Sequence, residues 1–373
     1  MTKQKFDRNK PFNDLPLLPP KLNLDNDPQV LKKLVSASRA LASVDGNIKR
    51  LPNPYMLVNT IALQEARTST EIENIFTTED ELYKAITDNV KESKANFATK
   101  EVLRYREAMW AGYRSIKDIG TINLQSIVRI SQQVKDTSQG IRTPQSRVVI
   151  KRGQSEFRAG EVIYTPPRGE GIVEKLMQNL IEFLNNDEKF PMDPLLKMCI
   201  AHYQFEVIHP FMDGNGRTGR ILNLLYLVHK NLLSHPTLYL SKYIIVYKDD
   251  YYYKLSTVTN RSKWKDWVIF MLDAVEKTSG MTNNLISEIL EQMDTSLKYG
   301  KKHLKWYSKE LNEAIFSQPY IKPKVIKQVI GKSSRTTITK YMGELVKAGI
   351  LSHTKDGAEV YYINNELIRI LEQ

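Results

Sequence analysis

Twelve residues between two apolar stretches constrain this chain most: His209 to Arg220, with the sequence HPFMDGNGRTGR. The flanking stretches, 194–208 and 221–228, repeat apolar residues at helical spacing and predict two buried helices. Glycines between them allow successive backbone N–H groups to turn toward a ligand, and the second helix presents its positive end there. The sequence therefore predicts an anion-binding turn between two helices.

The polar side chains of this segment suit a metal polyphosphate beside a base. Arg217 and Arg220 are three residues apart, hence on one helix face, and their planar donor forks fit several phosphates. Asp213 offers hard oxygen atoms for Mg²⁺, and His209 titrates near neutral pH, as a general base should. Singly, each fragment is commoner as a turn or a helix cap, so the combination carries the prediction of group transfer from a nucleoside triphosphate.

Two other phosphate or metal sites are excluded by residue type. A calcium loop of the EF-hand kind needs further oxygen ligands and a terminal Glu, where this segment has Arg217, Thr218 and Arg220. A Walker-type loop needs a Lys followed by Ser or Thr after its glycines, and the segment lacks that pair.

Composition sets the class of protein and of partner. The 373 residues suffice for two or three domains, and 54 Lys and Arg against 42 Asp and Glu give a net charge of +12, which favours anionic partners. The single cysteine, Cys199, lies in an apolar helical run and is expected to be a buried, inert thiol. Neither a signal peptide nor an apolar stretch of membrane-spanning length is apparent, so we expect a cytoplasmic protein that makes no membrane contact.

Periodicity and turn residues divide the chain into a mainly helical fold with one hairpin. The Pro-rich residues 1–28 predict an extended arm, and β-branched pairs around a polar turn predict a β-hairpin within 142–167. Helices are expected from Pro28 onward and over 55–75, 79–94, 100–114, 171–186 and 281–299. We expect four parts: 1–100 (arm and first helices), 101–280 (catalytic core), 281–300 (connecting helix) and 301–373.

The twelve-residue segment matches the HPFx[DE]GNGRxxR signature of the Fic family at every fixed position, and the resemblance extends over roughly residues 30–290. It implies a helical bundle with a small β-hairpin flap, which aligns a target segment by strand addition, and transfer of AMP from ATP to Ser, Thr or Tyr of a protein. Kinase relatives lack the second glycine or the last arginine; Gly216 and Arg220 are both present here.

The resemblance also implies roles for single residues. His209 would deprotonate the target hydroxyl, and Asp213 would hold Mg²⁺ on the α- and β-phosphates. Asn215 and the glycine amides would bind the α-phosphate, and Arg217 and Arg220 the β- and γ-phosphates. The full set expected at the nucleotide is Gly214, Asn215, Gly216, Arg217, Thr218, Gly219 and Arg220, with Tyr252 chosen from Tyr251, Tyr252 and Tyr253 for the adenine.

A second motif resembles the [ST]xxxE[GN] inhibitory helix of Fic proteins. Its residues are Ser69, Glu73 and Asn74, and its position before the core is typical of the class whose inhibitor is part of the same chain. Glu73 would pair with Arg220 and so occupy the guanidinium that should hold the γ-phosphate.

Residues 301–373 differ from the rest in charge and pattern. They hold 13 Lys and Arg against 7 Asp and Glu, and they show helix, turn, helix, helix and a two-stranded wing, which resembles a winged helix-turn-helix. Its recognition helix, 335–348, carries Arg335, Thr336, Thr337, Thr339 and Lys340 near its start. DNA binding and protein docking are both compatible with this pattern.

Three functions remain open on the sequence. The first is a self-inhibited protein adenylyltransferase acting on target proteins or on itself; the second is the reverse activity, AMP removal, with Glu73 orienting a water. The third is a DNA-binding regulator whose core senses nucleotide. A homodimer is common among the relatives implied by the resemblance.

Overall fold

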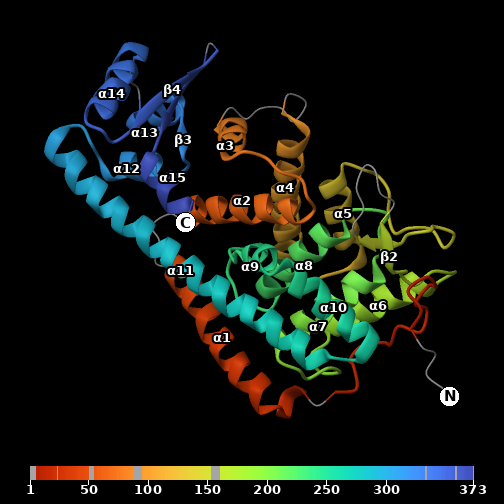
Figure 1. Cartoon of the computed structure of the whole chain (residues 1–373). Coiled ribbons are helices and arrows are strands. Elements are labelled where there is room, and N and C mark those ends of the chain that lie inside the picture. The colour runs from red at the N-terminus through yellow and green to blue at the C-terminus, as the bar shows by residue number, and fades with distance from the viewer. Residues whose placement is uncertain are drawn as a thin grey trace.

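The fold is mainly helical, as the sequence predicts, with two small antiparallel sheets. The computed structural model describes residues 6–22, 24–49, 54–87, 95–152, 160–331, 334–357 and 359–372. Figure 1 shows a helical body that carries the twelve-residue segment and a smaller C-terminal unit above it.

Two long helices support the body along one side. Helix α1 (Pro28–Lys49) buries Val30, Leu34, Ala37 and Leu41, whose spacing of three and four places them on one face. That face packs along α11 (Trp264–His303), which contacts α7 near one end and α12 and α15 near the other. The predicted connecting helix 281–299 is therefore the second half of one 40-residue helix, and the expected limit at residue 280 falls inside it.

The other helices of the body surround two buried helices, α7 (Pro194–Ile208) and α8 (Asn215–His229). Around them lie α2 (Pro54–Ile72), α3 (Glu79–Thr87), α4 (Phe97–Ile119), α5 (Leu124–Lys135), α6 (Ile172–Asn185), α9 (Leu240–Val246) and α10 (Lys248–Arg261), with a 3-10 turn at Leu24–Asn26. Several begin at side-chain caps, for example Asn96, whose Oδ1 accepts from the Thr99 amide at 2.8 Å. Cys199 is buried in α7, and burial raises the pKa of its thiol.

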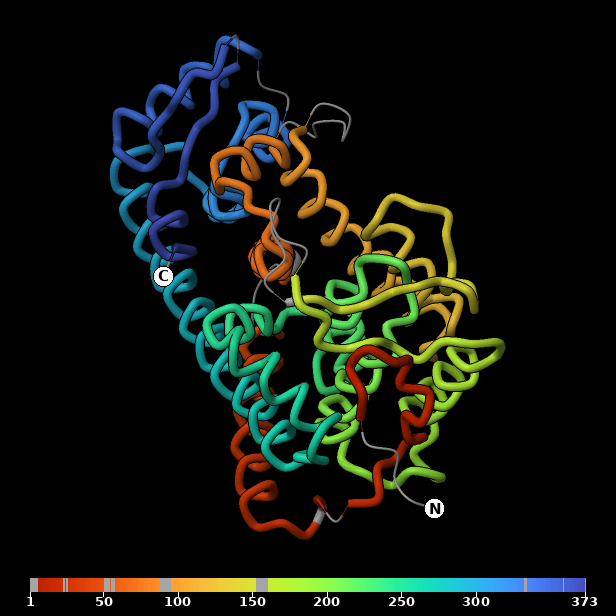
Figure 2. The backbone as a smooth tube through the Cα atoms, turned by 45° about the vertical axis from the view of Figure 1, so that its right-hand side comes forward, coloured from red at the N-terminus to blue at the C-terminus, as the bar shows by residue number. Residues whose placement is uncertain are grey.

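The predicted hairpin is present as β1 (Ile150–Arg152) and β2 (Glu161–Tyr164). Its first strand begins at Ile150, two residues later than the β-branched run indicates, and the connecting residues 153–159 lie outside the described part. The N-terminal arm packs against this hairpin: Phe6 and Phe12 contact the ring of Tyr164, and the Phe12 amide donates to the Thr165 carbonyl at 3.1 Å. Figure 2 shows the red arm crossing the hairpin.

The C-terminal unit contains the predicted helices and wing, with one further strand and one further helix. Its elements are α12 (Lys309–Ile315), β3 (Tyr320–Ile321), α13 (Pro323–Ile330), α14 (Arg335–Lys347), β4 (Ser352–Asp356), β5 (Glu359–Ile363) and α15 (Asn365–Leu371). The sheet order is β3-β5-β4, so the predicted wing is widened by β3. Assignment as a winged helix stays a prediction.

The C-terminal unit also touches α3 of the body. The Tyr320 hydroxyl donates to Asp80 at 2.7 Å, and Lys84 pairs with Asp356 at 2.8 Å. Helix α3 is tied in turn to α2, because Gln64 donates to the Tyr83 hydroxyl at 3.0 Å and Arg67 pairs with Glu79.

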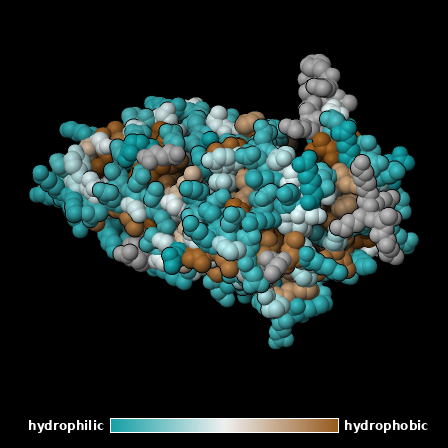
Figure 3. Space-filling model, turned by 60° about the horizontal axis from the view of Figure 1, so that its bottom comes forward, coloured by the Kyte–Doolittle hydropathy of each residue, from teal (hydrophilic) through white to brown (hydrophobic). Residues whose placement is uncertain are grey.

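The molecular surface in Figure 3 is mostly polar, with apolar residues in separate groups. Among the described helices, none is both long enough and apolar enough to cross a membrane.

Candidate active site

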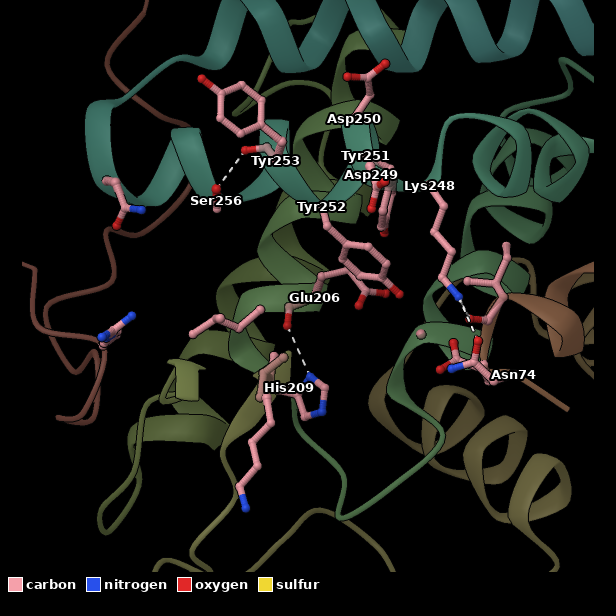
Figure 4. A pocket seen from close by; sticks show the side chains of 18 of the residues that line it. Asn74, Glu206, His209, Lys248, Asp249, Asp250, Tyr251, Tyr252, Tyr253 and Ser256 are labelled. Carbon is pink, nitrogen blue, oxygen red and sulfur yellow. Dashed lines mark hydrogen bonds between the residues drawn. The ribbon is translucent and has the colours of Figure 1, made fainter. Parts of the chain in front are cut away.

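A cavity of about 1510 Å³ opens where α2, α7, α8 and α10 converge beside the hairpin. Of the residues predicted from the sequence, His209, Gly216, Arg220, Tyr252, Glu73 and Asn74 line it. Figure 4 shows side chains from opposite walls pointing into this space.

His209 terminates α7 and faces the cavity. Its left-handed backbone, with φ 51° and ψ 59°, ends the helix, and its Nδ1 lies 3.3 Å from the Glu206 carbonyl oxygen. A proton on Nδ1 donated to that carbonyl leaves Nε2 as a free base. Burial lowers the pKa of His209 to about 4, so the imidazole is neutral at physiological pH.

Helix α8 begins earlier than its apolar run predicts, with Gly214 as N-cap at φ 77° and Asn215 and Gly216 already helical. The first-turn amides could therefore serve as the predicted anion site, from a helix end rather than from a loop. A Cβ at Gly216 would lie 2.6 Å from the Glu73 carboxylate oxygen and 3.0 Å from Arg220 Nη1. A side chain at this position would therefore have to displace the Glu73 carboxylate or the Arg220 guanidinium.

Asn215 is placed differently from the expectation. Its Oδ1 accepts from the Phe211 amide at 2.9 Å, and its Nδ2 donates to the Phe211 carbonyl at 2.9 Å, with 1% of the residue exposed. The side chain therefore fixes the loop before α8 and leaves phosphate contacts to the backbone.

Arg217 also turns away from the cavity. Its guanidinium pairs with Glu101 of α4, and each side chain is 2% exposed. The structure therefore does not place Arg217 for the expected phosphate contact. Its guanidinium is paired with Glu101, whereas that of Arg220 is paired with Glu73. Glu101 was not predicted from the sequence, because it lies 116 residues away and no local motif marks it.

Gly214, Thr218 and Gly219 support helix packing instead of lining the cavity. Thr218 is fully buried, and its amide donates to the Gly214 carbonyl at 3.0 Å. A Cβ at Gly219 would lie 2.5 Å from a Glu206 oxygen and 3.0 Å from the Phe205 ring. Gly219 thus lets α8 approach α7 closely.

Asp213 is exposed and is not among the residues that line the cavity; it pairs with Lys135 at 2.9 Å and accepts from the Gly214 amide at 2.6 Å. Burial alone would raise the pKa of Asp213, but the Lys135 ammonium outweighs it and holds the pKa below the ordinary value. No cluster of three or more His, Cys, Asp or Glu suited to a metal occurs among the described residues. One hard carboxylate fits Mg²⁺ shared with substrate phosphates, and not a cage made by the protein alone.

The predicted inhibitory residues lie against Arg220 at the end of α2. Arg220 Nη2 donates to Glu73 Oε1 at 2.7 Å and to the Ser69 carbonyl at 2.8 Å, and its Nε donates to the Ser69 hydroxyl at 2.7 Å. Burial opposes ionisation of Glu73, but the neighbouring Arg220 outweighs it and keeps the pKa of Glu73 below its ordinary value. The predicted contact between Glu73 and Arg220 is therefore present as an ion pair.

Asn74 follows with φ 61°, in the left-handed region that Asn and Gly tolerate best. The end of α2 is held further by Lys248, whose Nζ donates to the Ile72 carbonyl at 2.6 Å and to Asn74 Oδ1 at 3.1 Å. This role of Lys248 was not predicted from the sequence.

The three adjacent tyrosines of α10 have different surroundings. Tyr251 is 1% exposed, and its hydroxyl lies 2.8 Å from His202 Nε2, so its ring belongs to the core. Tyr252 and Tyr253 are 40% and 60% exposed and both line the cavity. Tyr251 also borders the cavity, but its burial leaves Tyr252 and Tyr253 as the more exposed rings there.

Glu206 is a cavity residue that the sequence analysis missed. Its Oε1 is buried without a hydrogen-bond partner among the described residues, and burial raises the pKa of its carboxyl to about 7. Its position one helical turn before His209 was the available signal.

Comparison with known proteins supports the resemblance over most of the chain. Residues 31–114 match the Fic/DOC family N-terminal model, 121–227 the Fic/DOC family model, and 289–367 the C-terminal domain of protein adenylyltransferase SoFic-like proteins. A curated relative, protein adenylyltransferase Fic of Drosophila willistoni, is 28% identical over 51% of this chain and 38% of its own length. That of Drosophila ananassae is 31% identical over 42% of this chain and 30% of its own length.

Solved structures show the same fold at low identity. A Fic family protein from Desulfovibrio desulfuricans G20 has a TM-score of 0.56 and 20% identity, covering 92% of this chain and 98% of that one. Fic-1 from C. elegans has a TM-score of 0.52 and 18% identity, covering 69% and 73%. The matched region spans about a third of the curated relatives' length. Three adjoining matches, the complete motif and the fold identify this chain as a member of the Fic/DOC family.

Proposed function

We propose that this protein is a self-inhibited protein adenylyltransferase, which transfers AMP from ATP to Ser, Thr or Tyr hydroxyls of target proteins. One observation carries the proposal: Arg220, beside the anion-binding end of α8, is occupied by Glu73 and Ser69 of the same chain. The names of the curated relatives support the reaction type.

The transfer requires one base and one phosphate anchor. The target hydroxyl oxygen attacks the α-phosphorus of ATP, the bond to the oxygen bridging the α- and β-phosphates breaks, and pyrophosphate leaves. The hydroxyl proton passes to Nε2 of His209, which burial keeps neutral and ready to accept it. Mg²⁺ held by Asp213 would neutralise charge on the phosphates.

The nucleotide contacts follow from which groups face the cavity. We assign the α-phosphate to the first-turn amides of α8 around Gly216, and the γ-phosphate to Arg220. Tyr252 remains the proposed adenine contact. Arg217 would serve a phosphate only after leaving Glu101, so we give it no direct contact here.

Inhibition follows from competition for one guanidinium. While Glu73 holds Arg220 at 2.7 Å, the γ-phosphate lacks its anchor and ATP binds in a non-productive pose. A charge-assisted pair of this kind in a partly dry site competes strongly with a ligand of the same charge.

Removal of AMP from modified proteins is the second candidate. It is favoured by the ionised carboxylate of Glu73, which lines the same cavity as His209 and could orient a water toward an α-phosphate. A nucleotide-sensing DNA-binding regulator is less supported, although Arg335 and Lys340 are exposed near the start of α14.

The deciding experiment uses α-labelled ATP with Mg²⁺ and three proteins: wild type, Glu73→Gly, and Glu73→Gly with His209→Ala. The protein itself and a lysate serve as acceptors. We expect weak label with wild type, strong label with Glu73→Gly and none with the double variant. Label only from γ-labelled ATP would refute AMP transfer. Faster loss of AMP with wild type than with Glu73→Gly would favour the removal activity.

A further inference from the structure

The N-terminal arm reaches the active-site cavity. Phe6, Asp7, Arg8 and Asn9 are among its lining residues, yet they precede all three stretches matched by family models, which begin at residue 31. The family models therefore do not imply their place in the site.

The arm is fixed to the hairpin that borders the cavity. Thr165 Oγ1 donates to the Arg8 carbonyl at 2.7 Å, the side chain of Arg8 pairs with Glu161, and Phe6 stacks on Tyr164 at 6.1 Å between ring centroids. A two-stranded hairpin is marginally stable alone, so these contacts hold the hairpin and the arm as one wall.

The arm lies at the end of the cavity away from the inhibitory helix. In Figure 4, Asn74 and Lys248 are on one side of His209, while Tyr253, Ser256 and the faint red arm are on the other. With its γ-phosphate at Arg220 and its α-phosphate near His209, a nucleotide leaves the rest of the cavity, which Tyr252, Tyr253 and the arm line, for its base. The arm is thus placed beside the base, and not beside the phosphates.

The polar groups at this end suit the edge of adenine. Asn9 brings a side-chain amide, and Asn260 of α10 brings a second one to the same cavity. The Asn9 side chain makes no hydrogen bond to another described residue, so its donor and acceptor are available to a ligand. An amide matches the adjacent acceptor and amine donor of adenine, as it does in reading adenine in DNA.

We propose that the N-terminal arm closes the base end of the nucleotide site and that Asn9 contributes to selection of adenine. This inference rests on the proposed function, because it takes its direction from the phosphate contacts assigned to Arg220 and α8. It assigns the arm to the nucleotide rather than to the target protein.

The test uses the full chain carrying Glu73→Gly, with Asn9→Asp added. A matched control carries Asn13→Asp, the same chemical change on the same arm but outside the cavity, where Asn13 Oδ1 only accepts from the Arg168 amide at 2.8 Å. Calorimetry measures binding of ATP, of GTP and of inorganic tripolyphosphate. We expect Asn9→Asp to weaken the binding of ATP about fivefold or more, which is the effect of one lost hydrogen bond. The ratio of ATP affinity to GTP affinity should decrease as well. Tripolyphosphate should bind all three proteins within about twofold.

Each other outcome overturns the inference in a distinct way. Unchanged ATP affinity, with an altered set of labelled proteins in a lysate, would assign the arm to the target. An equal loss for ATP and tripolyphosphate would show a general effect on the site. If Glu73→Gly itself shows no AMP transfer, the proposed function is refuted. If transfer is normal and Asn9→Asp leaves the ATP affinity unaltered, only the role of the arm is refuted.

Discussion

The hydroxyl of Ser69 accepts a hydrogen bond from Nε of Arg220 at 2.7 Å, so the inhibitory helix holds this guanidinium by more than the Glu73 carboxylate. Ser69→Ala removes that contact and leaves the ion pair. We expect AMP transfer to rise about three- to tenfold, since one such bond contributes about 1 kcal/mol, and to remain below that of Glu73→Gly. Thr70→Val is the control, because the Thr70 hydroxyl donates only to Ala66 of its own helix. Equal rates for Ser69→Ala and wild type would contradict this.

On acidification, the activity should fall only at an unusually low pH. Burial sets the pKa of His209 at about 4, and a general base acts only when deprotonated, so activity rises with pH through that value. In Glu73→Gly, which lacks a nearby negative charge that raises this pKa, we expect transfer to be level between about pH 5.5 and 8. Initial rates across this range provide the measurement. A limb near pH 6.5 would show a solvated imidazole.

Glu206 should make stability fall as pH rises. Its carboxyl has a pKa of about 7 in the native state because of burial, above the ordinary value of the unfolded chain. Between these two values the native state binds more protons, so the free energy of unfolding decreases with increasing pH, by at most about 3 kcal/mol. Denaturant unfolding of wild type and Glu206→Gln at about pH 4.5 and 8 checks this. Glu206→Gln, which cannot ionise, should lose less stability over that interval.

The metal requirement should respond in opposite directions at Asp213 and Lys135. Asp213→Asn removes the proposed Mg²⁺ ligand and should raise the half-saturating Mg²⁺ concentration about tenfold or more, with a smaller effect on binding of ATP without metal. Lys135→Met frees Asp213 from its 2.9 Å ion pair and should lower that concentration. Titration of Mg²⁺ in the Glu73→Gly background measures both. An unchanged requirement in Asp213→Asn would exclude this carboxylate as the ligand.

Contact between the C-terminal unit and α3 should influence inhibition. Tyr320→Phe removes the hydrogen bond to Asp80, which contributes about 1 kcal/mol, and loosens the path from α3 through Gln64 and Arg67 to the inhibitory helix. When Glu73 is present, we expect AMP transfer to rise two- to threefold, which is about the effect of partial release of one such bond. In Glu73→Gly we expect no rise. Arg369→Ala, which breaks an exposed pair with Glu366 inside the unit, is the control. A similar rise in both backgrounds would place the effect elsewhere.

The sequence predicted what depends on local pattern. The helices around 209–220 and the hairpin follow from periodicity and turn residues, whereas the contact of Glu73 with Arg220, 147 residues apart, was implied by the resemblance to the Fic family. It could not predict that Arg217 pairs with Glu101, because the choice between a distant carboxylate and a phosphate depends on how α4 packs beside α8. Asn215 was assigned to the ligand for a related reason: an amide serves a backbone or a phosphate equally well, and only the loop geometry decides.

The arm and the second half of the body show another limit. Residues 6–20 have no helical or strand period, and their position is fixed by contacts with the hairpin about 150 residues away. The sequence predicts a connecting helix over 281–299 and so places a limit at residue 280, inside the long helix. Gly280 nevertheless lies within α11, at a position where a side chain would meet open space.

Helix α11 has a mechanical consequence. Its 40 residues span about 60 Å without interruption, from contacts with α1 and α7 to contacts with α12 and α15. A continuous helix of this kind fixes the distance between the cavity and a partner bound to the C-terminal unit, whereas a flexible linker would allow a range of distances. A partner bound to the C-terminal unit would therefore transmit force to the body through α11, and the contact with α3 would provide a second route.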